Sequence, residues 1–196
     1  MNKDIVIETK RLILRQWKMQ DIEDMVEGLN NINVTKWLAG APFPYTVKDA
    51  EEFIQKTIDN NLYNFAIVLK SENKVIGGTQ LTNISIENGT AGGGIWINEK
   101  YQGYGYGSEA FGARIQYAFE VLGLRRLENG YFKENGKSHK MQLRFGYKDE
   151  GIKRQRFVSK ATGKIEDEYI TGLLKDEWIK QYNNICFVEQ NIVIGR

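Results

Sequence analysis

The feature that most constrains the fold is a glycine-rich segment, residues 102–108, which reads Gln-Gly-Tyr-Gly-Tyr-Gly-Ser. It follows a predicted strand at residues 93–97 and leads into the strongest helical pattern of the chain, at about residues 107–122. Gly123 then provides a C-terminal cap, and residues 125–132 form the next predicted strand. A strand, a helix and a strand in this order predict a parallel strand pair with a helical crossover.

Short strands and helices are predicted over most of the remaining chain. Further strands are expected at residues 11–15, 64–69, 74–81, 147–158 and 168–174, and further helices at 21–29, after the N-cap Thr46, at 138–145 and at 176–182. Short turns at residues 71–73 and 161–164 favour antiparallel neighbours. Because no linker-like tract or repeat divides the sequence, we expect one domain of the α+β class, residues 1–196.

Composition excludes several classes of protein. The formal charge of +2 is too balanced for a dedicated nucleic-acid binder. Cys186 and His139 are the single residues of their types, too few for an intramolecular disulfide or a structural zinc site. We therefore interpret Cys186 as an apolar residue rather than a nucleophile. No apolar run is long enough to span a membrane, and no signal peptide is evident, so a cytoplasmic protein is expected.

The glycine-rich segment has the properties of an anion site. Glycine lets the backbone turn with positive φ, and the N-terminus of the following helix offers unpaired N–H groups and a partial positive charge. A P-loop is excluded because Ser108 and Glu109, not lysine, follow Gly107. A dinucleotide fingerprint fits poorly, since its sixth position is Ser108 and the segment lies in mid-chain. A plain tight turn remains the alternative.

The pattern Gln-x-x-Gly-x-Gly at Gln102, Gly105 and Gly107 resembles the pyrophosphate loop of the GNAT superfamily of N-acetyltransferases. Other blocks are similar, in the same order, to the subgroup of ribosomal-protein-alanine N-acetyltransferases, and together they cover about residues 7–180. These blocks are residues 9–15 with Asp21, 94–97, 101–110, Asn135 with Ser138, Gly146 with Tyr147, and 168–178.

The resemblance implies a mixed α/β fold. A central, mostly antiparallel sheet of about six or seven strands would have helices on both faces and a parallel, splayed strand pair that holds the cofactor. The apolar tail within residues 183–196 would add a strand. That strand would pair within its own domain or in a homodimer, and both options stay open.

The resemblance also implies acetyl-CoA as cosubstrate, no metal, and a set of binding residues. Backbone N–H groups of the loop would bind the pyrophosphate, a strand end would pair with the pantetheine arm, and Asn135 would hold that arm from the next helix. Lys137 or Lys140 would meet the 3′-phosphate, or else form a solvated basic face. The implied cofactor-binding residues are Trp96, Ile97, Gln102, Gly103, Tyr104, Gly105, Tyr106, Gly107, Ser108, Asn135 and Lys137.

The chemistry implied is direct transfer of the acetyl group to a primary amine in a ternary complex. Ser138 is the catalytic candidate for protonating the leaving thiolate, because Gln142 stands where many relatives have a tyrosine; a purely structural Ser138 is the alternative. The subgroup often has an acidic residue where this chain has Gly92. Glu87 and Glu109 are possible bases, but Glu109 fits a structural role at a helix N-terminus. No base is assigned.

Three functions follow for testing. The leading one is an acetyltransferase whose acceptor is a protein N-terminus or a small amine. A CoA-binding regulatory or interaction module without catalysis is the alternative, because of Gly92 and Gln142. A nucleotide-binding oxidoreductase is disfavoured by the position of the glycine segment.

Overall fold

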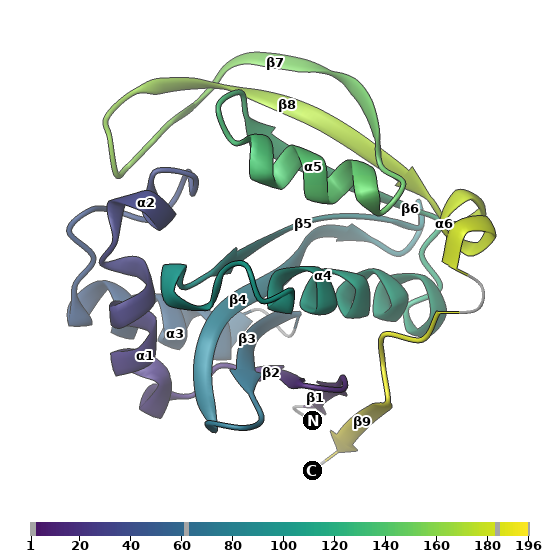
Figure 1. The fold of residues 1–196 in the computed structure, drawn as a ribbon, viewed down its shortest axis with the longest axis horizontal. Coiled ribbons are helices and arrows are strands. Elements are labelled where there is room, and N and C mark those ends of the chain that lie inside the picture. Colours follow the sequence, from purple (N-terminus) through teal and green to yellow (C-terminus); the bar gives the residue numbers. More distant parts are fainter. Residues whose placement is uncertain (1–2, 61–62, 183–184, 196) are drawn as a thin grey trace.

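The computed structural model describes residues 3–60, 63–182 and 185–195, and a nine-stranded sheet runs through it (Figure 1). The strand order is β7-β8-β6-β5-β4-β3-β2-β1-β9. The strands are β1 (Lys3–Glu8), β2 (Leu12–Gln16), β3 (Asn64–Leu69), β4 (Lys74–Ser85), β5 (Thr90–Ile97), β6 (Arg126–Phe132), β7 (Lys148–Val158), β8 (Ile165–Leu174) and β9 (Gln190–Gly195). Among these, β5 and β6 are parallel and the other neighbours are antiparallel.

Helices cover both faces of the sheet (Figure 1). They are α1 (Ile22–Leu29), α2 (Ile32–Thr35), α3 (Val47–Asn60), α4 (Tyr106–Gln116), α5 (Gly136–Arg144) and α6 (Lys175–Tyr182). Alternation along β3 shows the two layers, because Phe65 and Ile67 pack in one core cluster with α4, whereas Ala66 and Val68 pack in the other with α1 and α3. All residues of β3 are buried for this reason. No helix in the described residues is long and apolar enough to cross a membrane.

The predicted crossover is confirmed. Strand β5, helix α4 and strand β6 follow one another, and the two strands pair in parallel. The regular helix ends at Gln116 and continues as a π-helical turn, Tyr117–Val121, before Gly123 ends it with a φ of +67°. The apolar spacing predicted one regular helix to Leu122. It gave no sign of the wider π-helical turn, because Ala118 and Phe119 are buried there as the helical spacing requires.

The predicted fold class is also confirmed, and the sheet is larger than expected. Its two additional strands lie near the chain ends: β1, next to β2, was not anticipated, and β9 pairs antiparallel with β1 of the same chain and forms the edge. The tail therefore pairs within its own domain, one of the two options left open. Helix α3 begins as predicted: Asp49 N donates to the Thr46 hydroxyl at 3.3 Å, and Thr46 N donates to Asp49 Oδ2 at 2.8 Å.

Candidate active site

The gap between β5 and β6 is the central feature of the site. Their parallel ladder runs from Thr90 and Arg126 only as far as Gly93 and Asn129. Beyond this point β5 continues to Ile97 with β4 as its partner, and β6 continues beside β8. The two strands therefore separate, and the edge of β5 that faces the gap is free to bind an extended ligand as an added strand.

Arg114 of α4 spans the point where the strands separate. Its Nη1 donates to the carbonyls of Gln80 and Gly94, at 3.1 and 3.0 Å, and its Nη2 lies 3.4 Å from Asn129 Oδ1. The side chain is buried, and burial lowers the pKa of the guanidinium. A Cβ at Gly93 would lie 2.6 Å from Arg114 Nη1, so glycine is required here. Sequence reasoning missed this residue because a single arginine in an amphipathic helix gives no sign that it is buried.

The glycine-rich loop joins the end of β5 to α4. Gly103 and Gly105 have φ values of +89° and +85°, and Gly105 is the N-cap of α4. The first hydrogen bond into the helix runs from Glu109 N to Gly105 O at 3.0 Å. The N–H groups just before Glu109 therefore lie at the open helix end, where an anion is stabilised. The loop has the geometry that the sequence predicted.

Gln102 ties this loop to two other parts of the site. Its Nε2 donates to Ile97 O at the end of β5, at 2.9 Å, and its Oε1 lies 3.4 Å from Lys137 Nζ of α5. The structure thus brings together three of the predicted residues. Trp96 differs, because its indole stacks on Trp17 in the core beside α1 and only its backbone faces the strand edge.

Arg11, just before β2, contacts the glycine-rich loop and the first turn of α4. Its Nη1 donates to Tyr104 O at 3.0 Å, its guanidinium lies 4.5 Å from the centre of the Tyr106 ring, and its Nε donates to Glu109 at 2.7 Å. Glu109 also accepts from the Thr9 hydroxyl at 2.6 Å and from Arg11 N at 2.8 Å. Burial opposes ionisation of Glu109, but these hydrogen bonds outweigh it and lower its pKa. Glu109 is therefore structural, as expected.

Ser138 lies in the first turn of α5, on the same side of the sheet as α4. Asn135 caps this helix, with its Oδ1 accepting from Ser138 N at 3.2 Å. Ser138 Oγ accepts from Gln142 Nε2 at 2.9 Å, and the buried Gln142 in turn accepts from the Thr171 hydroxyl of β8. This contact uses a lone pair of Oγ and leaves its hydrogen free to be donated. Gln142 is thus the residue that orients Ser138.

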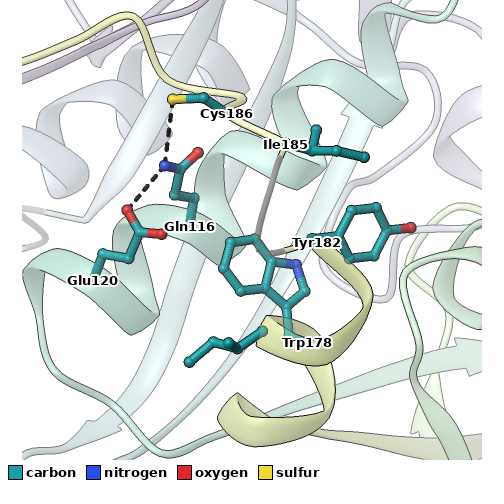
Figure 2. Close-up of a pocket in the computed structure, with 7 residues that line it drawn as sticks. Gln116, Glu120, Trp178, Tyr182, Ile185 and Cys186 are labelled. Atoms are coloured by element: carbon teal, nitrogen blue, oxygen red, sulfur yellow. Dashed lines mark hydrogen bonds between the residues drawn. The ribbon is translucent and has the colours of Figure 1, made fainter.

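His139 and Cys186 are placed differently from Ser138. His139 is partly buried: it stacks on Tyr131, and its Nε2 lies 3.0 Å from Asp149 Oδ1. Cys186 is exposed and lines a hollow of about 420 Å³ between α4 and α6 (Figure 2). Its Sγ donates to Val188 O at 2.9 Å. None of the predicted site residues lines this hollow.

The separated strands β5 and β6 and the glycine-rich loop at the N-terminus of α4 together form the candidate site. The model of the acetyltransferase (GNAT) domain matches residues 11–148 of this chain. The chain therefore belongs to the GNAT acetyltransferase family, and it is an acetyltransferase enzyme.

Individual relatives agree with this assignment. The uncharacterized N-acetyltransferase p20 of Bacillus licheniformis is 33% identical over 174 residues, which cover 87% of this chain and 96% of that protein. The ribosomal-protein-serine acetyltransferase of Escherichia coli is 30% identical over 57% of this chain and 66% of its own length. The crystal structure of the spermidine N-acetyltransferase of Vibrio cholerae, in complex with CoA and spermine, shares the fold. Its TM-score is 0.73 at 23% identity, over 86% of this chain and 98% of that one.

Proposed function

We propose that this enzyme transfers the acetyl group of acetyl-CoA to a primary amine, with both substrates bound at once. The observation that supports this most strongly is the position of the two left-handed glycines. They lie at the N-terminus of α4, directly after the strand whose free edge faces the gap. Pyrophosphate at the helix end and an extended arm along the edge of β5 are the two parts of CoA that such a geometry accommodates.

The loop residues fit a pyrophosphate sterically. A Cβ at Gly103 would meet nothing within 4 Å, and one at Gly105 would meet only the Arg11 guanidinium, at 3.4 Å. The backbone at Gly103 and Gly105 is therefore open to an approaching anion. Lys137, next to Gln102, adds positive charge on the α5 side and is our candidate for a CoA phosphate.

Ser138 is our candidate for the proton that the leaving thiolate needs. Acetyl-CoA supplies an activated acyl group, and the chain's residues must position it and move protons. Gln142 fixes the Ser138 oxygen by a hydrogen bond to a lone pair, so the hydroxyl hydrogen can face the gap. Asn135 is fixed as the helix cap, and its side-chain N–H group is the part we assign to the CoA arm.

The acceptor that we propose is a protein N-terminal amine or a small amine. The relatives' names include a ribosomal-protein-serine and a spermidine acetyltransferase, and the two classes share a primary amine. Action in the cytoplasm and formation of a homodimer stay predictions from the sequence. A non-catalytic CoA-binding module remains the competing function, because this chain has Gly92 where the similar subgroup often has an acidic residue.

The test is transfer from acetyl-CoA to a panel of amines. The panel contains peptides with N-terminal alanine or serine, an internal-lysine peptide, spermidine, an aminoglycoside and free amino acids. Release of free thiol gives the rate, and mass spectrometry locates the acetyl group. We expect transfer to at least one amine. Binding of CoA without transfer to any member would contradict the enzymatic function and favour the non-catalytic module.

A further inference from the structure

A carboxylate lies on β6, beside the point where β5 and β6 separate. Glu128 of β6 pairs with Gly92 of β5, one step before the parallel ladder ends at Gly93 and Asn129. Paired residues of parallel strands direct their side chains to the same face of a sheet. Glu128 therefore supplies a carboxylate on the same face that a side chain at position 92 would occupy.

Glu128 and Ser138 lie on opposite faces of the sheet. Asn129, the next residue of β6, contacts Arg114 of α4, so the odd residues of this strand face α4 and α5. Glu128 pairs with Gly172 of β8, where a Cβ would run into Arg126 and Glu150 on the other face. Ser138 is linked through Gln142 to Thr171, the residue paired with Asn129, and so lies on the α5 side.

The sheet face next to Glu128 has room for a ligand. A Cβ at Gly94 would meet nothing within 4 Å, and one at Gly92 would have the Thr82 hydroxyl, at 3.1 Å, as its nearest neighbour. Gly94 is the first residue of β5 beyond the parallel ladder, and Gly92 lies two residues before it on the same face. Farther along the same face, the Trp96 indole packs against Gly28 of α1 and occupies the space at that end.

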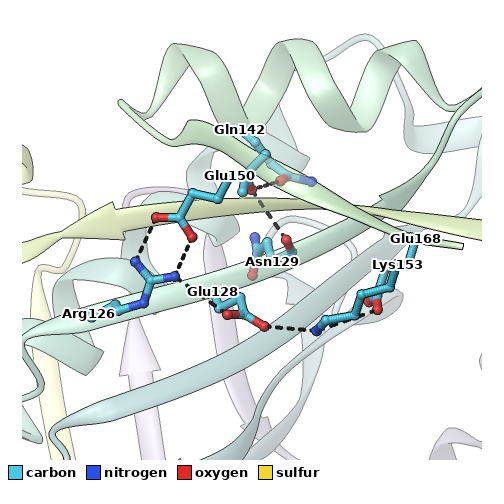
Figure 3. Close-up of polar contacts among 8 residues, drawn as sticks. Arg126, Glu128, Asn129, Gln142, Glu150, Lys153 and Glu168 are labelled. Carbon is cyan, nitrogen blue, oxygen red and sulfur yellow. Dashed lines mark hydrogen bonds and ion pairs between the residues drawn. The ribbon is translucent and has the colours of Figure 1, made fainter. Parts of the chain in front are cut away.

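Two cationic side chains hold the Glu128 carboxylate only loosely. Its Oε1 lies 3.4 Å from Lys153 Nζ, and its Oε2 lies 3.5 Å from Arg126 Nη2 (Figure 3). Both contacts are long. Arg126 is engaged mainly by Glu150 through two hydrogen bonds, and these lower the pKa of Glu150. Glu128 makes no bidentate ion pair, and its contact with the ammonium group of Lys153 is long. The ammonium group of an acceptor can therefore take the place of Lys153.

We propose that Glu128 receives the proton of the acceptor amine, which approaches over Gly92 and Gly94 from the face opposite Ser138. The inference rests on the proposed function. The acceptor arrives as the ammonium that predominates at pH 7 and gives its first proton to the Glu128 carboxylate, which passes it to solvent. The neutral nitrogen then forms a bond to the acetyl carbon and loses its second proton to Glu128, while the C–S bond breaks and the sulfur takes a proton from Ser138 Oγ. Solvent carries the second proton from Glu128 to Ser138, so two protons leave nitrogen, one arrives on sulfur and one is released. Because Glu128 and Ser138 lie on opposite faces of the sheet, each can reach one side of the acetyl carbonyl carbon.

The experiment compares wild type, Glu128→Gln and the control Glu87→Gln, with saturating acetyl-CoA and the fastest amine of the panel. Glu87 lies in the exposed turn between β4 and β5, away from the gap. We expect Glu128→Gln to lower kcat by about 10²- to 10³-fold at pH 7, as for loss of a general base. The Kd of acetyl-CoA and the Tm should stay at wild-type values, and Glu87→Gln should behave as wild type.

The pH profile separates a base from a merely structural residue. Without Glu128 the rate should follow the neutral fraction of the amine, so the deficit should shrink as pH rises toward the amine pKa, about 8 for an α-amine and about 10.4 for a lysine-like amine. A Glu128→Gln variant with wild-type kcat/KM and pH profile would overturn the role of Glu128 alone. A wild-type enzyme that binds CoA yet acetylates no amine would overturn the proposed function, and the role of Glu128 with it.

Discussion

Replacing Glu109 with alanine should both destabilise the fold and loosen the loop that precedes it. The carboxylate accepts three hydrogen bonds, from the Thr9 hydroxyl at 2.6 Å, Arg11 N at 2.8 Å and Arg11 Nε at 2.7 Å. Two bonds to neutral donors contribute about 1 kcal/mol each. The charge-assisted bond contributes about 1–2 kcal/mol, because the Arg11 side chain is 41% exposed and solvent screens it. The sum is about 3–4 kcal/mol.

The assay is urea unfolding at pH 7, with thermal unfolding alongside. For a chain of this size, each kcal/mol lowers Tm by about 2–4 °C, so a fall of about 6–16 °C is expected. Glu109→Gln can keep the two neutral contacts and should lose about 1–2 kcal/mol. Glu51→Ala, on the exposed side of α3, is the control and should change the free energy of unfolding by less than about 0.5 kcal/mol.

Acetyl-CoA affinity gives a second readout for the same variant. Arg11 joins Glu109 to the Tyr104 carbonyl and the Tyr106 ring, so Glu109→Ala should weaken binding as well. If Glu109→Ala unfolds at the same urea concentration as Glu51→Ala, the reasoning about this anchor is refuted.

Three further predictions concern other parts of the molecule. Gly93→Ala should lower the free energy of unfolding by about 2–4 kcal/mol in urea, because its Cβ would collide with the Gln80 carbonyl and a buried guanidinium; a stability equal to wild type would contradict the packing. Hydrogen bonds from Lys100 and Lys74 lower the pKa of Glu27 from 4.5 to about 2. The stability from these contacts should be complete above pH 4.5 and disappear as pH falls through about 2, and Glu27→Gln should flatten that part of the stability profile. Ser138→Ala should reduce kcat more than it weakens acetyl-CoA binding, and an unchanged kcat would remove Ser138 from the mechanism.

Features with a local signature could be predicted from the sequence. The N-cap of α3 at Thr46 and the strand, helix and strand around α4 were read correctly, because caps and apolar spacing act over a few residues. The positive φ angles of Gly103 and Gly105 were anticipated for the same reason. The fold class followed from these elements in order.

Features that depend on long-range pairing could not be predicted. Glu128 lies beside Gly92 only because β5 and β6 pair in one register across an intervening helix. Likewise, Arg11 reaches a loop more than 90 residues away in the chain, and its role follows from the sheet order. Pairing of β9 with β1 joins the two ends of the chain and has no local signal either.

Calorimetric titration of acetyl-CoA into wild type and Gly105→Glu tests the central claim most directly. The control is Gly163→Glu, which adds the same charge at another positive φ with nothing within 4 Å, in the β7–β8 turn. We predict saturable binding of acetyl-CoA and CoA, but not NADH, to wild type and to Gly163→Glu. Gly105→Glu, folded by circular dichroism, should not bind, because its carboxylate would stand where we propose that the pyrophosphate binds. Wild-type affinity in Gly105→Glu, or no binding of CoA to wild type, would contradict the account.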